Sequence, residues 1–466
     1  MIRIIRDILK IPELRTRIFW TLLLLVVFRV GFFIYVPGID IPTFLTTVAS
    51  QKSREGGAAD WLIYTSALTG GNLNTPVLFS LGIMPYISAS IIFSLMIKVF
   101  PRLEALSKEG EQGRRTINRY TRYSTVVICL VQALFLVNNW QRPVEGTSIS
   151  TASGLLSWVA VLQVLTLSVG SLFLMWLGEK ITEYGIGNGT SIIIMVGIIS
   201  DMPAAFGMVS NKIRNADTDQ QPFEITKALV TLAMYFAVVA AVVFITKGQR
   251  RIPVQQQRAV KGRRVYGGQR QYMPIKVNAA GVLPIIFAQS LIVIPSTFLS
   301  AFALKYSDNE FFRLLYRFAA AFHRGGFFYM AAFVGMIFFF TYFWTTLMFN
   351  PVEIAGNMKE YGSFIPGIRP GKFTAEYLEK ILKRVTLAGA TFLCAIALVP
   401  QVIANAVEVD YYIAHFMGGT TILIVVGVAL DLVDKIEAQL LVRQYEGFMR
   451  TAESPRRGGA TTGSST

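Results

Sequence analysis

Apolar runs of about 20 residues recur along this chain, and they constrain its fold more than any other feature of the sequence. Such a run is the length that an α-helix needs to cross the hydrocarbon core of a bilayer. The runs are continuous rather than alternating, which argues against a transmembrane β-barrel. Of the 466 residues, 53% are hydrophobic and 15% are charged, whereas about 25% of the residues in a soluble domain are charged. The sequence therefore predicts an all-α polytopic membrane protein.

Ten of these runs are predicted to be transmembrane helices. They cover residues 18–38, 76–100, 123–140, 155–178, 188–208, 228–246, 278–302, 327–348, 385–404 and 417–438. An even number of spans places both termini on one side, and Lys and Arg accumulate on the cytoplasmic side. Of the 44 Lys and Arg residues, 33 fall in segments that share a side with the termini or at the inner ends of the spans beside them, 10 fall in the opposite segments, and Arg29 lies within the first span. Both termini are therefore predicted to be cytoplasmic.

The two ends of the chain lie outside these spans. Residues 1–17, MIRIIRDILKIPELRTR, are basic and amphipathic, which predicts an interfacial helix on the inner membrane face. Residues 439–466 form a predicted cytoplasmic tail. Its last part, ESPRRGGATTGSST, is poor in apolar residues, so the tail is predicted to be partly disordered.

Residues that could carry catalysis or bind a metal are scarce. Cys129 and Cys394 lie inside apolar runs and are interpreted as small core residues. His323 and His415 fall in outer loops, and the chain has no HExxH, GxGxxG or Walker motif. We therefore expect no metal, no cofactor and no enzymatic activity.

Ionisable residues are also rare within the spans. Arg29 lies just past the middle of the first span and either extends toward the outer interface or faces a watery cavity. Asp201 lies toward the outer end of the fifth span, and Asp431 and Asp434 lie near the inner end of the tenth. Secondary transporters usually place such groups at mid-membrane. This pattern counts against a transporter, and the missing catalytic motifs count against an intramembrane enzyme.

The cytoplasmic loop 247–276 carries nine Lys or Arg residues and no acid. Either the loop is basic for topology alone, or it also binds a polyanionic or acidic partner, such as ribosomal RNA or an acidic motor protein. Val265 and Tyr266, followed by Gly267 and Gly268, predict a short hairpin.

A second cytoplasmic loop, 349–384, contains FIPGIRPGKFT. The dipeptides Pro366-Gly367 and Pro370-Gly371 favour turns and flank Arg369. The segment is either an ordinary turn or a stiff tip that presents one guanidinium group.

Glycine and proline interrupt two of the spans in the same pattern. Gly82 and Pro85 lie in the second span, and Gly281 and Pro284 repeat their spacing in the seventh. Broken helices at membrane depth are tolerated only beside protein or a water-filled cavity. We therefore expect a two-part second segment with a loosely packed first piece, and an internal duplication with a site between its halves.

Eight stretches, in order, resemble the SecY family, the protein-conducting channels of the bacterial Sec translocon. They are FRVGFFIYVPGID, LGIMPYISASII, KEGEQGRRTINRYTRY, FLMWLGEKITEYGIGNGTSIII, GQRR with GRRVY, KVNAAGVLP, FIPGIRPG and GGTTILIVVGVALD. The resemblance runs from about Arg17 to Tyr445. It implies two halves, residues 18–208 and 209–438, clamped around an hourglass pore.

The resemblance also assigns roles to residues inside the membrane. Spans two and seven resemble a lateral gate, with Ser88, Ser90 and Asn278 as polar gate residues, and Asn278 paired with a serine such as Ser90. Residues 64–74 resemble a plug that includes Gly70, Gly71 and Asn72. The pore constriction is implied to be an apolar ring of Ile83, Ile87, Ile194, Ile286 and Ile424. A narrow ring of this kind dewets and resists ions at rest.

On the cytoplasmic side the resemblance implies docking of the SecA ATPase and of the ribosome. The residues implied to dock them are Arg250, Arg251, Arg258, Arg263, Arg264 and Arg369. Further implied partners are the SecE and SecG subunits, signal peptides, nascent chains and membrane lipids. The implied function is passage of unfolded polypeptides across the bacterial cytoplasmic membrane, with lateral insertion of transmembrane segments. The sequence departs from the family pattern at Lys247, Thr190 and Asp201.

Overall fold

The structure is a computed structural model of the 466-residue chain. It describes residues 11–42, 44, 76–141, 154, 157–215, 221–256, 259–261, 264–266, 270–289, 291–292, 326–407 and 418–453. The predicted plug and most of the predicted interfacial N-terminal segment lie outside the described residues.

Long helices make up most of the described chain. In chain order the helical elements are α2 (Pro12–Val30), η1 (Gly31–Phe33), α5 (Met84–Val99), α6 (Pro101–Lys108), α7 (Glu111–Trp140), α8 (Trp158–Tyr184), α9 (Gly189–Asn215), α10 (Gln221–Lys247), α13 (Phe327–Met348), α14 (Pro351–Glu360), α15 (Lys372–Ala406) and α17 (Gly419–Glu453). The strands are β1 (Gln249–Gln256), β2 (Ala259–Lys261), β3 (Arg264–Tyr266), β4 (Arg270–Lys276) and β5 (Ser363–Phe364).

The helices match the predicted spans. Within the described residues, seven helices are long and apolar enough to cross a membrane, and eight if the bent pair α5 and α6 counts as one span. The other two predicted spans coincide with α17 and with the helical residues 283–289 and 291–292. The all-α polytopic architecture is therefore confirmed.

Two helices extend beyond the spans predicted from hydropathy. The first long helix begins at Pro12, ahead of the predicted span start at residue 18, because proline is well suited to the first turn of a helix. The last helix continues to Glu453, so it includes residues 439–453 of the predicted tail. Charged residues outside the bilayer do not stop a helix, whereas hydropathy marks only the part within the membrane.

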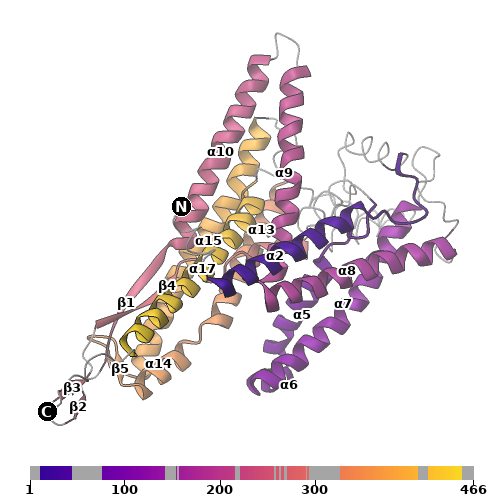
Figure 1. Ribbon diagram of the computed structural model, residues 1–466. Helices are drawn as coiled ribbons and strands as arrows, with labels where there is room; N and C mark the ends of the chain where they lie inside the picture. Colours follow the sequence, from indigo (N-terminus) through magenta and orange to yellow (C-terminus); the bar gives the residue numbers. More distant parts are fainter. Residues whose placement is uncertain are drawn as a thin grey trace, which may run out of the picture.

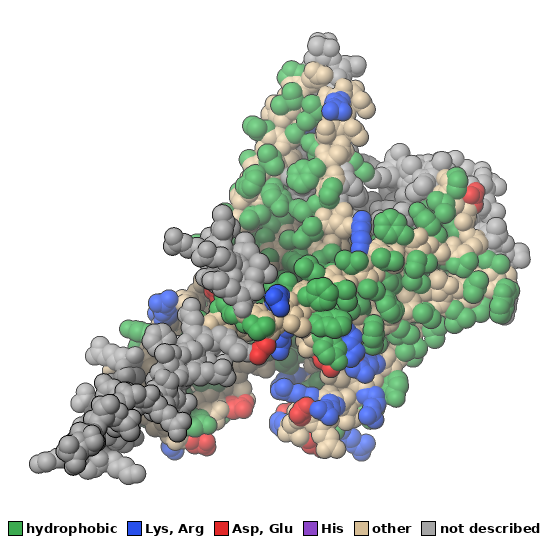
Figure 2. Space-filling model, viewed as in Figure 1, with side chains coloured by type: hydrophobic (Ala, Val, Ile, Leu, Met, Phe, Trp, Pro, Cys, Tyr) green, Lys and Arg blue, Asp and Glu red, His purple; other side chains and the backbone are tan. Residues whose placement is uncertain are grey.

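The helices form two groups in space. In Figure 1 the early helices α2, α5, α7 and α8 lie together on one side, and the later helices α10, α13, α15 and α17 lie on the other. Helix α9 packs against both α8 and α17. Hydrophobic side chains cover most of the visible helical surface, while Lys and Arg gather around α6 and the start of α7 (Figure 2). This distribution is typical of a membrane protein with a basic cytoplasmic face.

Helix α5 begins where Gly82 and Pro85 predict a break. Gly82 has a φ of 58°, and Pro85 lies in the first turn of α5. Glycine adopts positive φ at little cost, and proline in the first turn loses no intrahelical hydrogen bond. Gly281 repeats this geometry with a φ of 66°, just before the helix that begins at residue 283. A glycine with positive φ therefore precedes the first turn of both predicted gate helices.

The piece that precedes α5 is not loosely packed, so that part of the expectation is wrong for residues 76–83. The Phe79 ring stacks between Phe28 and Phe173, at centroid distances of 6.2 and 6.1 Å. Backbone hydrogen bonds from Val36 to Pro76 and from Leu78 to Ile34 tie the piece to the end of the first span. Aromatic residues brought together by distant helices are not visible as a local sequence pattern.

Candidate functional site

The five isoleucines of the predicted ring share one extended hydrophobic cluster. Four of them are buried members, with exposed fractions of 0% for Ile83, 3% for Ile424, 5% for Ile194 and 7% for Ile286. Ile87 is partly buried and packs against the same cluster. These residues come from both groups of helices. Their role as a pore constriction stays a prediction.

The break at Gly82 explains how one short segment supplies two of these residues. Ile83 is the N-cap of α5, and the backbone amide of Ile87 donates to the carbonyl of Ile83. Residues four apart lie on one face of a helix. Ile83 is held by the packed segment before α5, and Ile87 by the first turn of α5 itself.

The three predicted polar gate residues are partly buried. Ser88 and Ser90 lie on α5. The Oδ1 atom of Asn278 is buried without a hydrogen-bond partner, and the pairing of Asn278 with Ser90 stays a prediction. The Ser90 carbonyl accepts a hydrogen bond from the Ser94 hydroxyl within α5. Gly70, Gly71 and Asn72 lie outside the described residues.

The two loops predicted to be cytoplasmic form one structure. Strands β1 and β4 pair antiparallel from Gln249↔Lys276 to Gln255↔Arg270, and β5 from the second loop pairs with the other edge of β1. A short hairpin that contains Val265 and Tyr266 is present, because β2 pairs antiparallel with β3. Gly267 and Gly268 follow β3 and do not connect the two strands of this hairpin. A glycine pair permits a turn but does not determine strand register.

A small hydrophobic core fixes this sheet to α15. Its buried members are Ile252, Ile275, Ile365, Leu378 and Leu382. The cluster joins both loops to one end of α15, a helix long and apolar enough to cross a membrane. We refer to β1, β4, β5 and this cluster as the platform, which is predicted to be cytoplasmic.

The predicted docking arginines that can be described lie on the surface of the platform. Arg250 and Arg251 are exposed on β1, while the next residue, Ile252, is buried below them. Arg369 is exposed, and its carbonyl accepts a hydrogen bond from the Thr374 hydroxyl at 2.9 Å. The side chains of Arg258, Arg263 and Arg264 lie outside the described part of the chain.

An ion-pair clamp holds the base of the platform to α17. Lys247 donates to the Asp434 carboxylate at 2.7 Å, and the Lys276 ammonium lies 3.9 Å from the same carboxylate. The hydrogen bond with Asp434 raises the pKa of Lys247, because it stabilises the charged ammonium. One carboxylate on α17 therefore contacts both ends of the first loop. The sequence placed Asp434 only near the inner end of the tenth span.

Replacing Asp434 by Asn is expected to loosen the base of the platform without unfolding it. The amide cannot form an ion pair, so backbone amide exchange near Gln249 and Lys276 should become about two- to fivefold faster, the range expected for exposed ion pairs. Hydrogen exchange followed by mass spectrometry measures this. Asp431→Asn is the matched control, because Asp431 pairs with Lys435 on its own helix. Equal exchange in both variants would show that Asp434 does not hold the platform.

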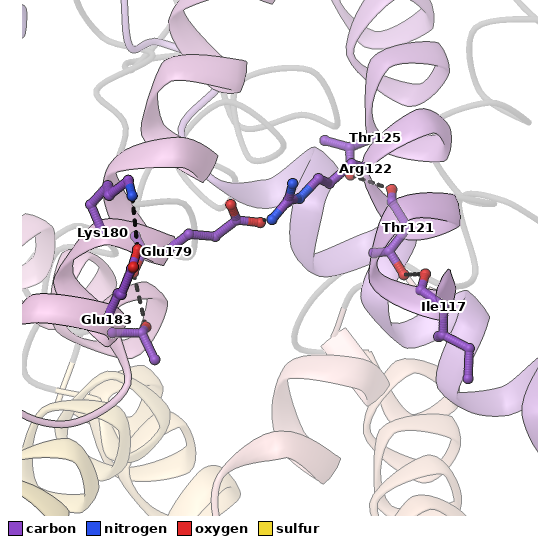
Figure 3. Close-up of polar contacts among 9 residues, drawn as sticks. Ile117, Thr121, Arg122, Thr125, Glu179, Lys180 and Glu183 are labelled. Atoms are coloured by element: carbon purple, nitrogen blue, oxygen red, sulfur yellow. Dashed lines mark hydrogen bonds and ion pairs between the residues drawn. The ribbon is translucent and has the colours of Figure 1, made fainter. Parts of the chain in front are cut away.

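A second ion pair, also missed from the sequence, joins α7 to α8. Arg122 Nε donates to Glu179 Oε1 at 2.8 Å across the space between the two helices (Figure 3). On α8, Lys180 forms a separate ion pair with Glu183 at 2.8 Å. Both Arg122 and Glu179 lie in stretches that resemble the SecY family. A charged residue near the end of each long apolar run was the available signal.

The described residues offer little for metal chemistry. Among them, no group of three or more His, Cys, Asp or Glu side chains lies close enough to hold a metal ion. Cys129 and Cys394 are buried free thiols, as their positions in apolar runs predicted. Arg29 is exposed, with its guanidinium 5.5 Å from the centre of the Phe32 ring.

Comparisons with known proteins agree with this architecture. A sequence model of the SecY family matches residues 77–433. The chain is 39% identical to a protein translocase subunit SecY of Thermotoga maritima, over 96% of this chain and 97% of that one. It is 42% identical to that of Thermus thermophilus, with 96% and 98% covered, and 38% identical to that of Escherichia coli K12, with 94% and 95% covered.

Solved structures share the fold at low sequence identity. A structure described as a protein conducting channel matches with a TM-score of 0.60 and 18% identity, over 91% of this chain and 92% of that chain. Sec61 in a canine ribosome-channel complex matches with a TM-score of 0.56 and 17% identity, with the same coverage.

Proposed function

The chain belongs to the SecY family of protein translocase subunits, and from this premise we propose how its parts conduct polypeptides. Unfolded secretory chains pass through the ring of Ile83, Ile87, Ile194, Ile286 and Ile424. Transmembrane segments leave sideways between α5 and the helix that begins at residue 283. The observation that best supports this is the convergence of the five isoleucines, from both groups of helices, on one buried cluster.

The physical properties of the ring suit a channel that must carry many sequences. A narrow apolar constriction excludes water and ions at rest. Isoleucine is stiff at χ1, so several such side chains can close around an extended chain. Because the ring is apolar, it does not select any one passing side chain by charge. Opening needs only the separation of helices that meet at the cluster.

The driving force comes from partners in this proposal. SecA or a translating ribosome docks on the platform, through Arg250, Arg251 and Arg369 and the neighbouring basic residues of the first loop. Arg250 and Arg251 are exposed on β1, and Arg369 is exposed in the turn between β5 and α15. Their exposure on a platform with its own hydrophobic core supports this role. A sheet that is anchored by its own hydrophobic core transmits the force of a docked partner better than two separate loops. SecE and SecG complete the membrane complex.

We further propose that the protein resides in a bacterial cytoplasmic membrane with both termini in the cytoplasm. The excess of Lys and Arg in the segments that share a side with the termini supports this orientation. Lys and Arg gather around α6 and the start of α7, at one end of the molecule (Figure 2). Signal peptides and nascent chains reach the ring from this side, and lipids border the gate.

The proposed lateral exit predicts the effect of a covalent lock. One cysteine is placed in α5 and one in the helix that begins at residue 283, in a protein whose buried Cys129 and Cys394 are replaced by alanine. Oxidation is expected to block insertion of transmembrane segments, because the two helices can no longer separate. Insertion is measured in proteoliposomes before and after reduction.

The matched control for the lock carries one cysteine in α7 and one in α8, two helices that pack together within one group. Oxidation there should leave insertion unchanged. If insertion continues in the oxidised gate variant, the exit lies between other helices.

A further inference from the structure

Among the described residues, Gln289 is the one whose buried side chain has two polar atoms without a hydrogen-bond partner. Only 1% of it is exposed. Neither Oε1 nor Nε2 has a hydrogen-bond partner. Transfer of an amide from water into apolar surroundings is costly unless hydrogen bonds are regained. The structure therefore buries a group whose hydrogen-bonding capacity is unused.

The position of Gln289 places it beside the ring. It lies three residues after Ile286 and four after Ile285, which puts all three on one face of the same helix. Ile285, Ile286 and Ile292 belong to the central buried cluster. This helix runs away from Lys276 and the platform, so Gln289 lies about one turn beyond the ring, toward the outer side.

The chemistry of the amide indicates which ligand would use it. A primary amide has one carbonyl acceptor and two N–H donors, so it can bind a donor and an acceptor together. An extended polypeptide carries both groups on every residue except proline. Inside an apolar ring, such a chain loses its water and cannot pair with the isoleucines. Among the groups that a translocating chain always presents, its backbone is the one that this amide matches.

We propose that Gln289 binds the backbone of a polypeptide held in the ring, with Oε1 accepting from an N–H and Nε2 donating to a C=O. The inference rests on the proposed channel function. It gives the apolar ring one polar contact that does not depend on the side chains in transit. It also couples occupancy to opening, because an arriving chain satisfies the two atoms that the closed channel leaves unpaired.

The test is the release of a stalled chain from proteoliposomes that contain the full-length protein and its motor. The substrate has a folded domain at one end, and the segment that stops in the ring is either alternating Gly and Ala or a run of proline. Gln289→Met keeps the length of the side chain and removes both polar atoms. It should release the Gly-Ala chain roughly thirtyfold faster, the change that two net hydrogen bonds correspond to.

Proline provides the discriminating comparison, because it has no backbone N–H. The acceleration caused by Gln289→Met should be clearly smaller for the proline segment. Ile292→Met is the matched control, a volume-conserving change one turn further along the same face, and should leave release unchanged. The unsubstituted protein should itself release the proline segment faster than the Gly-Ala segment, which tests the inference even if Gln289→Met folds poorly.

Equal acceleration for both segments, or none for either, would overturn the inference, as would equal release of the two segments by the unsubstituted protein. A buried water that satisfies the amide would leave the release of both segments unaccelerated in Gln289→Met. Failure of the channel proposal looks different, because the unsubstituted protein would then hold no stalled chain at all.

Discussion

Replacement of Arg369 by glutamate is expected to abolish motor-driven export while the protein remains folded. Arg369 is exposed between two turns, and Ile365 and Ile368 next to it pack into the hydrophobic cluster of the platform. The guanidinium is therefore presented from a fixed base. Loss of a docked charge pair, with a repulsive charge in its place, should lower the export rate by about a hundredfold or more. Export of a secretory precursor into proteoliposomes measures this.

Lys372→Glu is the matched control for Arg369→Glu. Lys372 is also exposed in the second loop, and it lies 4.0 Å from Glu376 on its own helix. The control makes the same change in net charge without altering the tip, so export should fall far less. If the two variants export equally well, the tip is an ordinary turn and not a docking site.

The second large effect is expected from the ring. Ile194→Ser combined with Ile424→Ser should make resting membranes permeable to ions. Each buried isoleucine contributes roughly 1.5–3 kcal/mol of apolar burial, so replacing two by a polar residue favours a hydrated constriction. We expect the resting conductance to rise by about tenfold or more, since about 1.4 kcal/mol corresponds to each factor of ten. Planar bilayer recordings without a motor or substrate measure the conductance.

Ile337→Ser provides the control for the ring. Ile337 lies on α13, is fully buried in the same cluster and is not a predicted ring residue. It should reduce thermal stability as the ring variants do, because all leave a cavity, but it should not raise conductance. A membrane that stays tight in the double ring variant would exclude these isoleucines as the seal.

The sequence predicted best what is set by local periodicity. All ten hydrophobic runs contain helical residues, and Gly82 and Gly281 mark true helix starts because positive φ is a local property. The five isoleucines could be named only through resemblance to the SecY family, since an isoleucine in an apolar run is equally compatible with contact to lipid.

The failures share a different cause, which is contact between distant segments. The stacking of Phe79 between α2 and α8, the pairing of β5 with β1, and the ion pairs of Asp434 all depend on tertiary arrangement. The strands of the short hairpin could not be assigned because strand register follows from pairing and not from the nearest glycines.

The pairing of β1 with β5 has a consequence for biosynthesis. Gln255 and Phe364 are neighbours in the sheet, yet α10 precedes the first strand and α13 must be threaded through the membrane before β5 is made. Long-range strand pairs form only after the loop between them has closed. A growing chain of this protein therefore completes its own platform late in synthesis, after its eighth span. Partially made copies would therefore lack the surface on which we propose that motors and ribosomes dock.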